Sequence, residues 1–238
     1  MSSLADLQKE LTKAADKNKV VILQRFFKTG PGDYGEGDVF LGIIVPQQRA
    51  IVKKYAARIK FPEIQKLLDS KFHESRLIAL LILVDQYEKN KEPLNRKKIV
   101  DFYLKNTKRI NNWDLVDLSV YKILGDWLLI NRAKIKILDR FTVSKNLWER
   151  RMAMIATYAF IKKGKTEEVI KIAERLLDDS HDLIHKAVGW MLREMGKRAS
   201  EPALLKFLNT HKDRMPRTAL RYAIEKLQLE QRKYYLKK

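Results

Sequence analysis

Cysteine is absent from the 238 residues of this chain, which excludes disulfide bonds, thiolate metal sites and thiol nucleophiles. Histidine is scarce, with only His73, His181, His185 and His211. The pair His181 and His185 has the i,i+4 spacing of a metal-binding helix, but it lacks the glutamate that follows the first histidine in HExxH. We therefore expect neither a metal site nor a cofactor.

Long apolar runs are also missing. No stretch of 18 uncharged apolar residues occurs, so no segment is expected to span a membrane. The opening residues 1–6 do not show the basic and then apolar pattern of a signal peptide. These absences predict a soluble, cytoplasmic protein.

Positive charge is abundant. The chain carries 49 Lys and Arg against 29 Asp and Glu, a formal net charge of +20. Such an excess attracts polyanions, which include DNA, RNA and anionic membrane surfaces, and the charge alone does not choose among them. A hydrophobic content of 45% argues against disorder, and the length suits one domain or one elongated array of repeats.

Apolar residues recur at spacings of three and four, which is typical of amphipathic helices, whereas the alternation expected of strands is rare. We therefore predict an all-α fold. The clearest helical stripes are Leu4, Leu7, Leu11 and Ala14; Leu77, Leu80, Leu81, Val84 and Tyr87; and Leu204, Phe207 and Leu208.

Several segments share one pattern: a short polar stretch with a helix-capping residue, then a basic residue, then a long apolar helix. It recurs about every 35 residues, which is the size of a HEAT-like helix pair. Stacked pairs curve into a superhelix with a concave groove. We predict a single HEAT-like repeat domain over residues 1–238, with a basic groove and a basic tail at about 230–238.

Four segments place a cation at what we take as one equivalent position: Arg76, Arg151, Lys186 and Arg217. A row of cations along one side of a groove predicts contact with a nucleic-acid backbone. In a fifth segment the position holds Asp117 instead. A carboxylate on a mainly apolar face needs a partner or water, and neighbouring cations would keep it ionised. It indicates a site that handles positive charge inside a surface made for negative charge.

Trp113 lies four residues before Asp117, so both residues share a helix face, although Trp113 could equally pack in the core. Arg150 and Arg151 point about 100° apart on a helix, so at most one faces the groove centre. The register with Lys186 favours Arg151, whose guanidinium could hold a phosphate through two hydrogen bonds.

Lys186, Trp190 and Arg193 follow i, i+4 and i+7 spacing and form one stripe. A tryptophan between two cations suits a nucleic-acid backbone with an aromatic wall, whereas Trp190 alone would more often be core. The glycine-rich residues 29–38 lack the Gly-Lys-Ser/Thr ending of a P-loop. This loop is expected either to touch DNA or simply to connect helices.

Together these segments resemble the AlkD family of alkylpurine DNA glycosylases over roughly residues 20 to 225. The motifs that carry the resemblance are FLGI at 40–43 with Pro46 and Arg49, WDLVD at 113–117, LGD at 124–126, NLWERR at 146–151 and KAVGWMLRE at 186–194. One departure is DLIH at 182–185, where some members have aromatic residues before the lysine.

The resemblance implies HEAT-like repeats that wrap duplex DNA and remove purines alkylated at N3 or N7, such as 3-methyladenine and 7-methylguanine. By resemblance, Trp113, Asp117 and Trp190 match the family's active-site cleft and Arg151 matches its arginine. It also implies that the lesion stays in the duplex rather than being flipped out. The remaining expected DNA contacts are Arg76, Arg150, Lys186, Arg193 and Arg217.

The chemistry expected from the residues agrees with this resemblance. A cationic purine is already a good leaving group, and Asp117 would stabilise the cationic sugar that forms and orient a water. The expected partner is double-stranded DNA containing alkylated purines, bound by a monomer. A HEAT-like protein that binds DNA or branched junctions without catalysis, and a scaffold for an acidic protein partner, are the alternatives.

Overall fold

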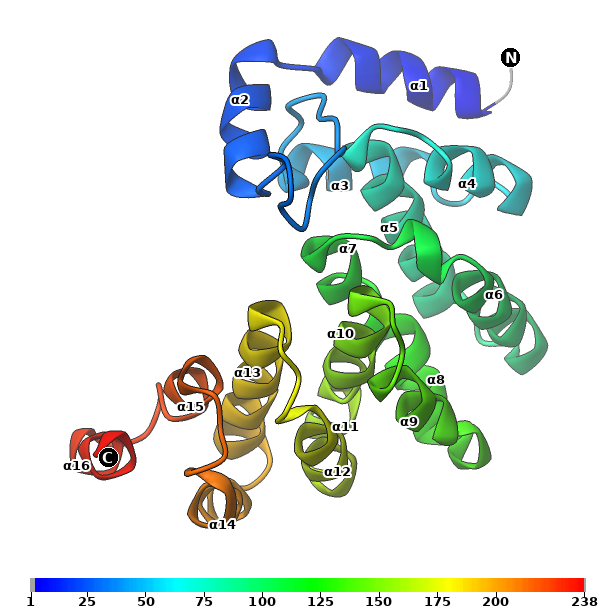
Figure 1. Cartoon of the computed structure of the whole chain (residues 1–238). Coiled ribbons are helices and arrows are strands. Elements are labelled where there is room, and N and C mark those ends of the chain that lie inside the picture. Colours follow the sequence, from blue (N-terminus) through cyan, green and yellow to red (C-terminus); the bar gives the residue numbers. More distant parts are fainter. Residues whose placement is uncertain (1–2, 238) are drawn as a thin grey trace. The chain divides into compact units, whose positions relative to one another are not determined.

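The computed structural model describes residues 3–237, which form helices joined by short connections (Figure 1). Within this range the only β-type pairing is an isolated bridge between Val39 and Phe72. The all-α prediction is therefore confirmed. The chain divides into two compact units, of which the first ends at Ser119 and the second begins at Val120. The single continuous domain remains a prediction.

The first unit is built around α5, which contacts α3, α4, α6 and α7. Nearly all of α5 is buried, including its polar first turn, His73 to Arg76. The glycine-rich segment 29–38 is a loop between α2 and α3, as predicted. The helices of this unit are α1 (Ser3–Ala14), α2 (Lys17–Phe26), α3 (Val45–Tyr55), α4 (Phe61–Leu68), α5 (His73–Lys89), α6 (Pro93–Lys105), η1 (Thr107–Arg109) and α7 (Trp113–Asp117).

The second unit is built around α13, which packs against α10, α11, α12, α14 and α15. A π-helical turn, η2, opens this unit. Its elements are η2 (Tyr121–Gly125), α8 (Asp126–Ile130), η3 (Arg132–Lys134), α9 (Lys136–Thr142), α10 (Leu147–Ala156), α11 (Tyr158–Ile161), α12 (Glu167–Leu176), α13 (Asp182–Arg198), α14 (Glu201–His211), α15 (Arg217–Ala223) and α16 (Leu229–Leu236).

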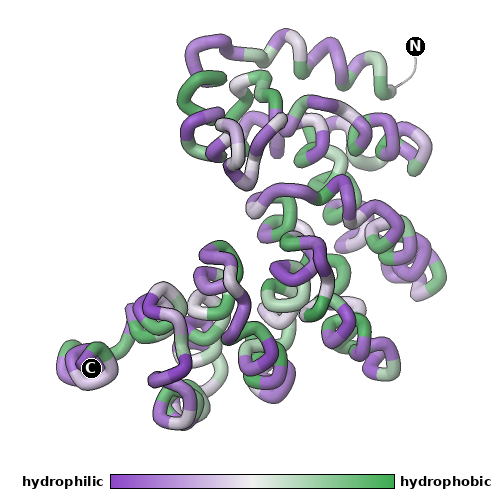
Figure 2. Tube along the Cα trace, viewed as in Figure 1, coloured by the Kyte–Doolittle hydropathy of each residue, from purple (hydrophilic) through white to green (hydrophobic). Residues whose placement is uncertain are grey.

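The helical stripes predicted from periodicity form the cores of the units. The predicted leucines of α1, α5 and α14 are buried, and Ala14 is partly exposed. Polar and apolar residues alternate along individual helices in Figure 2, as expected for amphipathic segments. Among these helices, α5 ends at Lys89, α11 at Ile161 and α13 at Arg198.

A shared anchor opens three of the repeats. Ser70 and Ser144 each accept a hydrogen bond through Oγ from the backbone N–H two residues later, and the Asp179 carboxylate does the same. In each case the helix begins three residues after the anchor, at His73, Leu147 and Asp182. The anchors at 144 and 179 set the repeat length near the predicted 35 residues.

The side chain six residues after each anchor contacts the backbone carbonyl of that anchor. Arg76 donates to the carbonyls of Ser70 and Lys71, and Arg150 donates to those of Ser144 and Lys145. His185 contacts the carbonyl of Asp179 through Nε2. Arg76 therefore corresponds to Arg150 and His185, and not to Arg151.

Counting from the helix starts corrects the row of cations. The fifth residues of α7, α10 and α13 are Asp117, Arg151 and Lys186, as predicted. In α5, however, the fifth residue is the buried Leu77, because Arg76 is the fourth. In α15 the fifth residue is Arg221, because Arg217 is the first. Asp117 therefore does occupy the position that holds a cation in α10 and α13. The row of equivalent cations contains Arg151 and Lys186, but not Arg76 or Arg217.

Gly189 brings α13 close to α15. A Cβ atom at this position would lie 2.4 Å from the Ala219 carbonyl oxygen and 2.5 Å from the Tyr222 Cβ. We expect Gly189→Ala to lower the free energy of unfolding by about 1–3 kcal/mol, because overpacking outweighs the better helix propensity of alanine. Urea unfolding measures the change.

Gly30→Ala is the matched control for this substitution. A Cβ atom at Gly30 would meet only the flexible Asp33 side chain, at 3.1 Å. The control should leave stability unchanged or slightly raised, because alanine reduces the freedom of the unfolded chain. Equal stability of the two variants would contradict the tight α13–α15 packing.

Every helix between residues 3 and 237 is too short or too polar to cross a lipid bilayer.

Candidate active site

The helix α7 carries Trp113 and Asp117 on its first and last residues. Its N-terminus is capped by Asn112, whose Oδ1 accepts a hydrogen bond from the Trp113 backbone N–H at 2.8 Å. Both Trp113 and Asp117 are partly exposed, whereas the residues between them are buried. Trp113 and Asp117 therefore lie one helical turn apart, as predicted, and each side chain is partly buried and partly exposed to solvent.

The negative charge of Asp117 affects the pKa of a buried group, the Tyr103 hydroxyl. Burial raises the pKa of the Tyr103 hydroxyl well above its ordinary value, a hydrogen bond with Ser119 opposes this rise, and the negative charge of Asp117 adds to it. The Tyr103 hydroxyl and the Ser119 hydroxyl lie 2.8 Å apart. Asp117 is thus close enough to the core to perturb a buried group electrostatically.

Trp113 packs in a cluster of aromatic rings. Phe27 stacks on it with a centroid distance of 5.2 Å and an interplanar angle of 15°, and Phe26 meets it edge-on at 5.7 Å. Phe26 is itself 61% exposed. The cluster holds the indole ring from the protein side and leaves part of it open to solvent.

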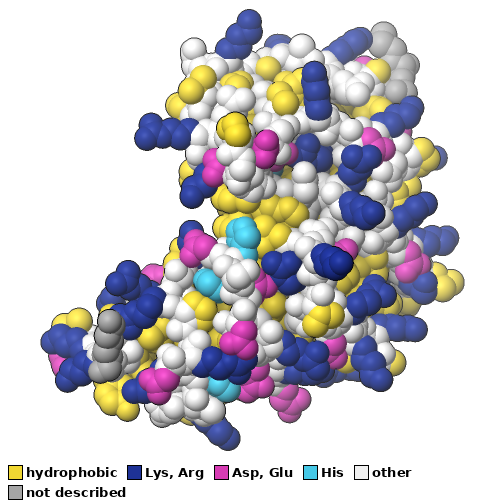
Figure 3. Space-filling model, viewed as in Figure 1, with side chains coloured by type: hydrophobic (Ala, Val, Ile, Leu, Met, Phe, Trp, Pro, Cys, Tyr) yellow, Lys and Arg dark blue, Asp and Glu magenta, His cyan; other side chains and the backbone are white. Residues whose placement is uncertain are grey.

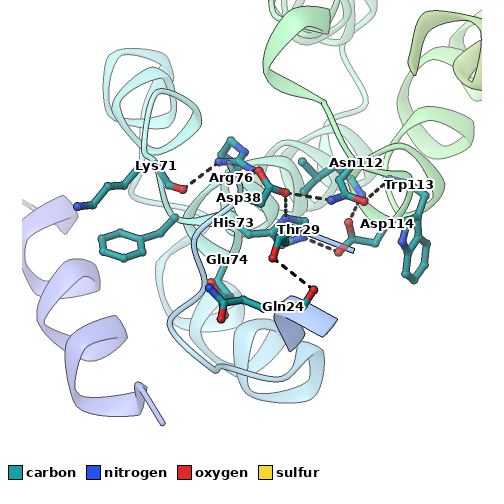
Figure 4. A network of polar contacts seen from close by, with 12 residues as sticks. Gln24, Thr29, Asp38, Lys71, His73, Glu74, Arg76, Asn112, Trp113 and Asp114 are labelled. Atoms are coloured by element: carbon teal, nitrogen blue, oxygen red, sulfur yellow. Dashed lines mark hydrogen bonds and ion pairs between the residues drawn. The ribbon is translucent and has the colours of Figure 1, made fainter. Parts of the chain in front are cut away.

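Beneath Trp113 lies a buried polar network that joins three segments of the first unit (Figure 4). His73, at the start of α5, contacts the Asp38 carboxylate through Nδ1 at 3.0 Å and the Asp114 carboxylate through Nε2 at 2.9 Å. Asn112 donates from Nδ2 to Asp38 at 2.9 Å, and Arg76 forms an ion pair with the same carboxylate. We call these five residues the His73 network.

Opposing effects set the charges in this network. Burial alone would lower the pKa of His73, but the carboxylates of Asp114 and Asp38 outweigh it and raise that pKa to about 9. Burial likewise opposes ionisation of Asp38, but hydrogen bonds from His73 and Asn112 and the charge of Arg76 hold its pKa below the ordinary value. At neutral pH the network therefore balances two carboxylates against an imidazolium and a guanidinium.

Another buried carboxyl group, that of Glu74, fixes the chain before α3. Glu74 accepts hydrogen bonds from three consecutive backbone N–H groups, those of Leu41, Gly42 and Ile43, at 2.9 to 3.1 Å. Gly42 has a φ of 85°, and a Cβ atom there would lie 2.0 Å from the Asp16 carbonyl oxygen. The FLGI motif therefore forms a turn that closes around the buried side chain of Glu74.

In the second unit, α10 places Arg150 and Arg151 in different environments. Arg151 is only 5% exposed and donates from Nη1 to the carbonyl oxygen of Leu183. Arg150 is partly exposed and pairs with Asp179 in addition to its two carbonyl contacts. The predicted preference for Arg151 over Arg150 at the groove stays a prediction.

The stripe on α13 exists as one helical face, because Lys186, Trp190 and Arg193 are all partly exposed. Lys186 pairs with Asp182 one turn earlier at 2.7 Å. Arg193 pairs with Glu225 and with Glu194, so its charge is already compensated. Trp190 follows Gly189, where α13 comes closest to α15.

The other predicted phosphate contacts differ in access. Arg217 is exposed, with weak contacts from its guanidinium to the Leu236 carbonyl at 3.4 and 3.5 Å. Arg76 is buried and pairs with Asp38, and its predicted contact with DNA stays a prediction. Lys and Arg side chains are spread over the face drawn in Figure 3. Among the described residues, no three His, Asp or Glu side chains are grouped as a metal site.

The His73 network and the contact of Phe27 with Trp113 were not predicted from the sequence. Partners in the network are separated by 35 and 41 residues. One local signal was available: His73, Glu74 and Arg76 lie in the first turn of a helix whose following residues, 77–84, are all apolar. Three ionisable side chains on such a helix indicate buried partners.

The fold and these residues define an all-α protein of helical repeats with a basic surface and an aromatic–carboxylate pair on α7. A search of the solved structures gives a chain described as "Predicted DNA alkylation repair enzyme from Enterococcus faecalis", with a TM-score of 0.72 and 18% sequence identity. The match covers 90% of this chain and 97% of that one. A search of curated protein sequences gives no significant match.

Residues 7–227 match the family model described as DNA alkylation repair enzyme. The chain belongs to this family, in agreement with the AlkD-like resemblance of its motifs. Membership implies a role in DNA repair, with DNA as the substrate.

Proposed function

We propose that this protein is a DNA glycosylase that hydrolyses the N-glycosidic bond of cationic N3- and N7-alkylated purines in duplex DNA. The observation that carries the proposal is Asp117, a partly exposed carboxylate four residues from Trp113 in a protein of net charge +20. A carboxylate repels phosphates, so it would weaken a surface that only binds the DNA backbone. The same carboxylate attracts a cationic base or sugar.

The reaction needs little acid catalysis. When the bond from the sugar C1′ to the purine breaks, its electron pair neutralises the positive charge of the alkylated base, and the charge moves to the sugar. Asp117 is proposed to stabilise this oxocarbenium-like sugar and to orient the water that adds to C1′. Loss of a proton from that water completes the hydrolysis.

The other catalytic roles are assigned by residue type. The faces of Trp113 and Trp190 would favour a cationic base or sugar through their ring quadrupoles, by about 0.5–2 kcal/mol each. Arg151, oriented by its bond to the Leu183 carbonyl, is proposed to hold a phosphate next to the lesion. Lys186, Arg193, Arg150 and Arg217 are proposed as further contacts to the DNA backbone.

The direct test incubates the protein with duplex DNA containing 7-methylguanine or 3-methyladenine and measures free base by chromatography. Release above the spontaneous rate is expected on both substrates. Tight, salt-dependent DNA binding without release would instead support a non-catalytic DNA-binding protein. Weak duplex affinity even at low salt would favour a scaffold for an acidic partner.

Lys186 provides a test of backbone contact. We expect Lys186→Gln to weaken binding to all duplex sequences alike and to reduce the slope of log affinity against log salt by about 1, because one phosphate contact is lost. Fluorescence anisotropy between 50 and 200 mM salt measures both quantities.

Lys97→Gln on α6 is the control, because Lys97 also forms an exposed i,i+4 ion pair, with Asp101. It should change neither affinity nor slope. If the two variants bind DNA equally, Lys186 is not a phosphate contact.

A further inference from the structure

The helix α7 is too short to hold its own position. It has five residues, and an isolated helix of this length is unstable in water because nucleation is costly. The placement of Trp113 and Asp117 must therefore come from tertiary contacts. Leu115 and Val116 supply buried apolar contacts, but apolar packing does not fix direction as hydrogen bonds do.

Two residues at the start of α7, Asn112 and Asp114, make directional contacts that lead into the His73 network. Asn112 caps the Trp113 N–H and at the same time donates to Asp38. Asp114 contacts His73 through Oδ2 and accepts the Leu115 backbone N–H through Oδ1 at 2.8 Å. The start of α7 is thus tied through Asn112 to the 29–38 loop and through Asp114 to α5.

Both ring nitrogens of His73 face carboxylate oxygens. A neutral imidazole donates from only one nitrogen, whereas the protonated ring donates from both. The charged groups around the ring are Asp38 from the loop, Asp114 from α7 and, on its own helix, Arg76, which reaches it through Asp38. Phe27 and Phe40 lie against the ring at centroid distances of 4.8 and 4.7 Å.

Phe27 also connects this ring to the candidate active site, because the same side chain stacks on Trp113. A change in the charge or position of His73 therefore reaches Trp113 by two routes. One runs through Asp114 and the backbone of α7, and the other runs through Phe27.

We propose that His73, bridging Asp38 and Asp114, is a positioning residue that holds α7 so that Trp113 and Asp117 are aligned for base release. The proposal rests on the glycosylase function proposed above. The members of the network are buried, so the proposal assigns them an effect on the positions of Trp113 and Asp117 and no contact of their own with DNA. Loss of the His73 proton would leave two carboxylates facing a single guanidinium and would remove the hydrogen bond from the ring to one of them.

The first test follows Trp113 directly, without reference to catalysis. The full-length protein is labelled with 5-fluorotryptophan, and the Trp113 resonance is assigned with Trp113→Phe. We expect this resonance to shift with pH with a midpoint near 9, the pKa of His73. The shift should disappear in His73→Gln, and the Trp127 resonance should not show it. A Trp113 resonance that does not change between pH 7 and 10 would overturn the proposal.

The second test separates positioning from binding. His73→Gln should lower the single-turnover rate of base release by about tenfold or more, because small misplacements of catalytic groups are costly, while DNA affinity stays within about twofold of wild type. The wild-type rate, corrected for spontaneous release, should fall with the same midpoint near 9. If His73→Gln released base at the wild-type rate, the positioning role of His73 would be rejected.

A charge-balanced double variant guards against simple unfolding. His73→Gln combined with Asp114→Asn restores the equality of charges, and the two new amides can hydrogen bond to each other. The double variant should release base faster than His73→Gln alone. A slower double variant would contradict the network's role. If the wild type releases no base at all, the glycosylase proposal fails, and the Trp113 resonance still decides whether His73 positions α7.

Discussion

Replacing Asp117 with asparagine should lower the single-turnover rate of base release from 7-methylguanine DNA by about 10²–10³-fold. The change keeps the shape of the side chain and removes its charge. Loss of one preorganised electrostatic group that stabilises a developing charge typically has an effect of this size. DNA affinity should be equal or higher, because a negative charge no longer repels the phosphates.

Two measurements make this prediction specific. Asp101→Asn removes a carboxylate from α6 that is exposed and paired with Lys97, and it should leave base release unchanged. The pKa of Tyr103 should fall in Asp117→Asn, because the nearby negative charge that helps to raise it is gone. Equal rates for Asp117→Asn and the wild type would reject the catalytic role of this residue.

Replacing Asp38 with asparagine should lower the free energy of unfolding by about 3–5 kcal/mol, because it leaves two buried cations without their shared carboxylate. Both His73 and Arg76 lose an ionic partner, and each is less than a tenth exposed. Urea unfolding at pH 7 measures the loss. Asp178→Asn, which removes the exposed partner of Arg214, should leave the unfolding midpoint in place. A loss for Asp38→Asn no larger than that control would contradict the network.

The same network predicts how wild-type stability depends on pH. The pKa of His73 is raised, so its contribution is complete below the ordinary value of 6.5 and is lost as the pH rises through about 9. The pKa of Asp38 is lowered, so its contribution is present above the ordinary value of 3.8 and is lost as the pH falls through the lower folded value. Stability should therefore decline on both sides of neutrality.

Local patterns predicted the local structure well. The stripe Leu77, Leu80, Leu81, Val84 and Tyr87 is buried because helical periodicity reports directly on which side of a helix avoids water. The equivalence of Asp117, Arg151 and Lys186, each the fifth residue of its helix, was also predicted from the sequence. Arg76 was misplaced because the sequence there offers one arginine where residues 150 and 151 offer two, and only the carbonyl contacts show which of the two it matches.

The His73 network could not be predicted in this way. Its contacts join a loop, a helix start and a second short helix that are distant in sequence, and no periodicity links them. The family resemblance did predict the fold and the repair function, because it draws on several motifs in order. The role of each site residue was inferred from that resemblance and from side-chain chemistry, and it remains to be measured.

The turn held by Glu74 bears on how this protein meets a polyanion. Consecutive backbone N–H groups that converge on one point form an anion-binding nest, the device with which many proteins grip phosphate. Here the chain fills that nest with its own carboxylate, at Leu41, Gly42 and Ile43. The main chain at this turn is thus closed to the phosphates of DNA. A contact of this turn with a DNA phosphate would therefore have to come from side chains and not from these N–H groups.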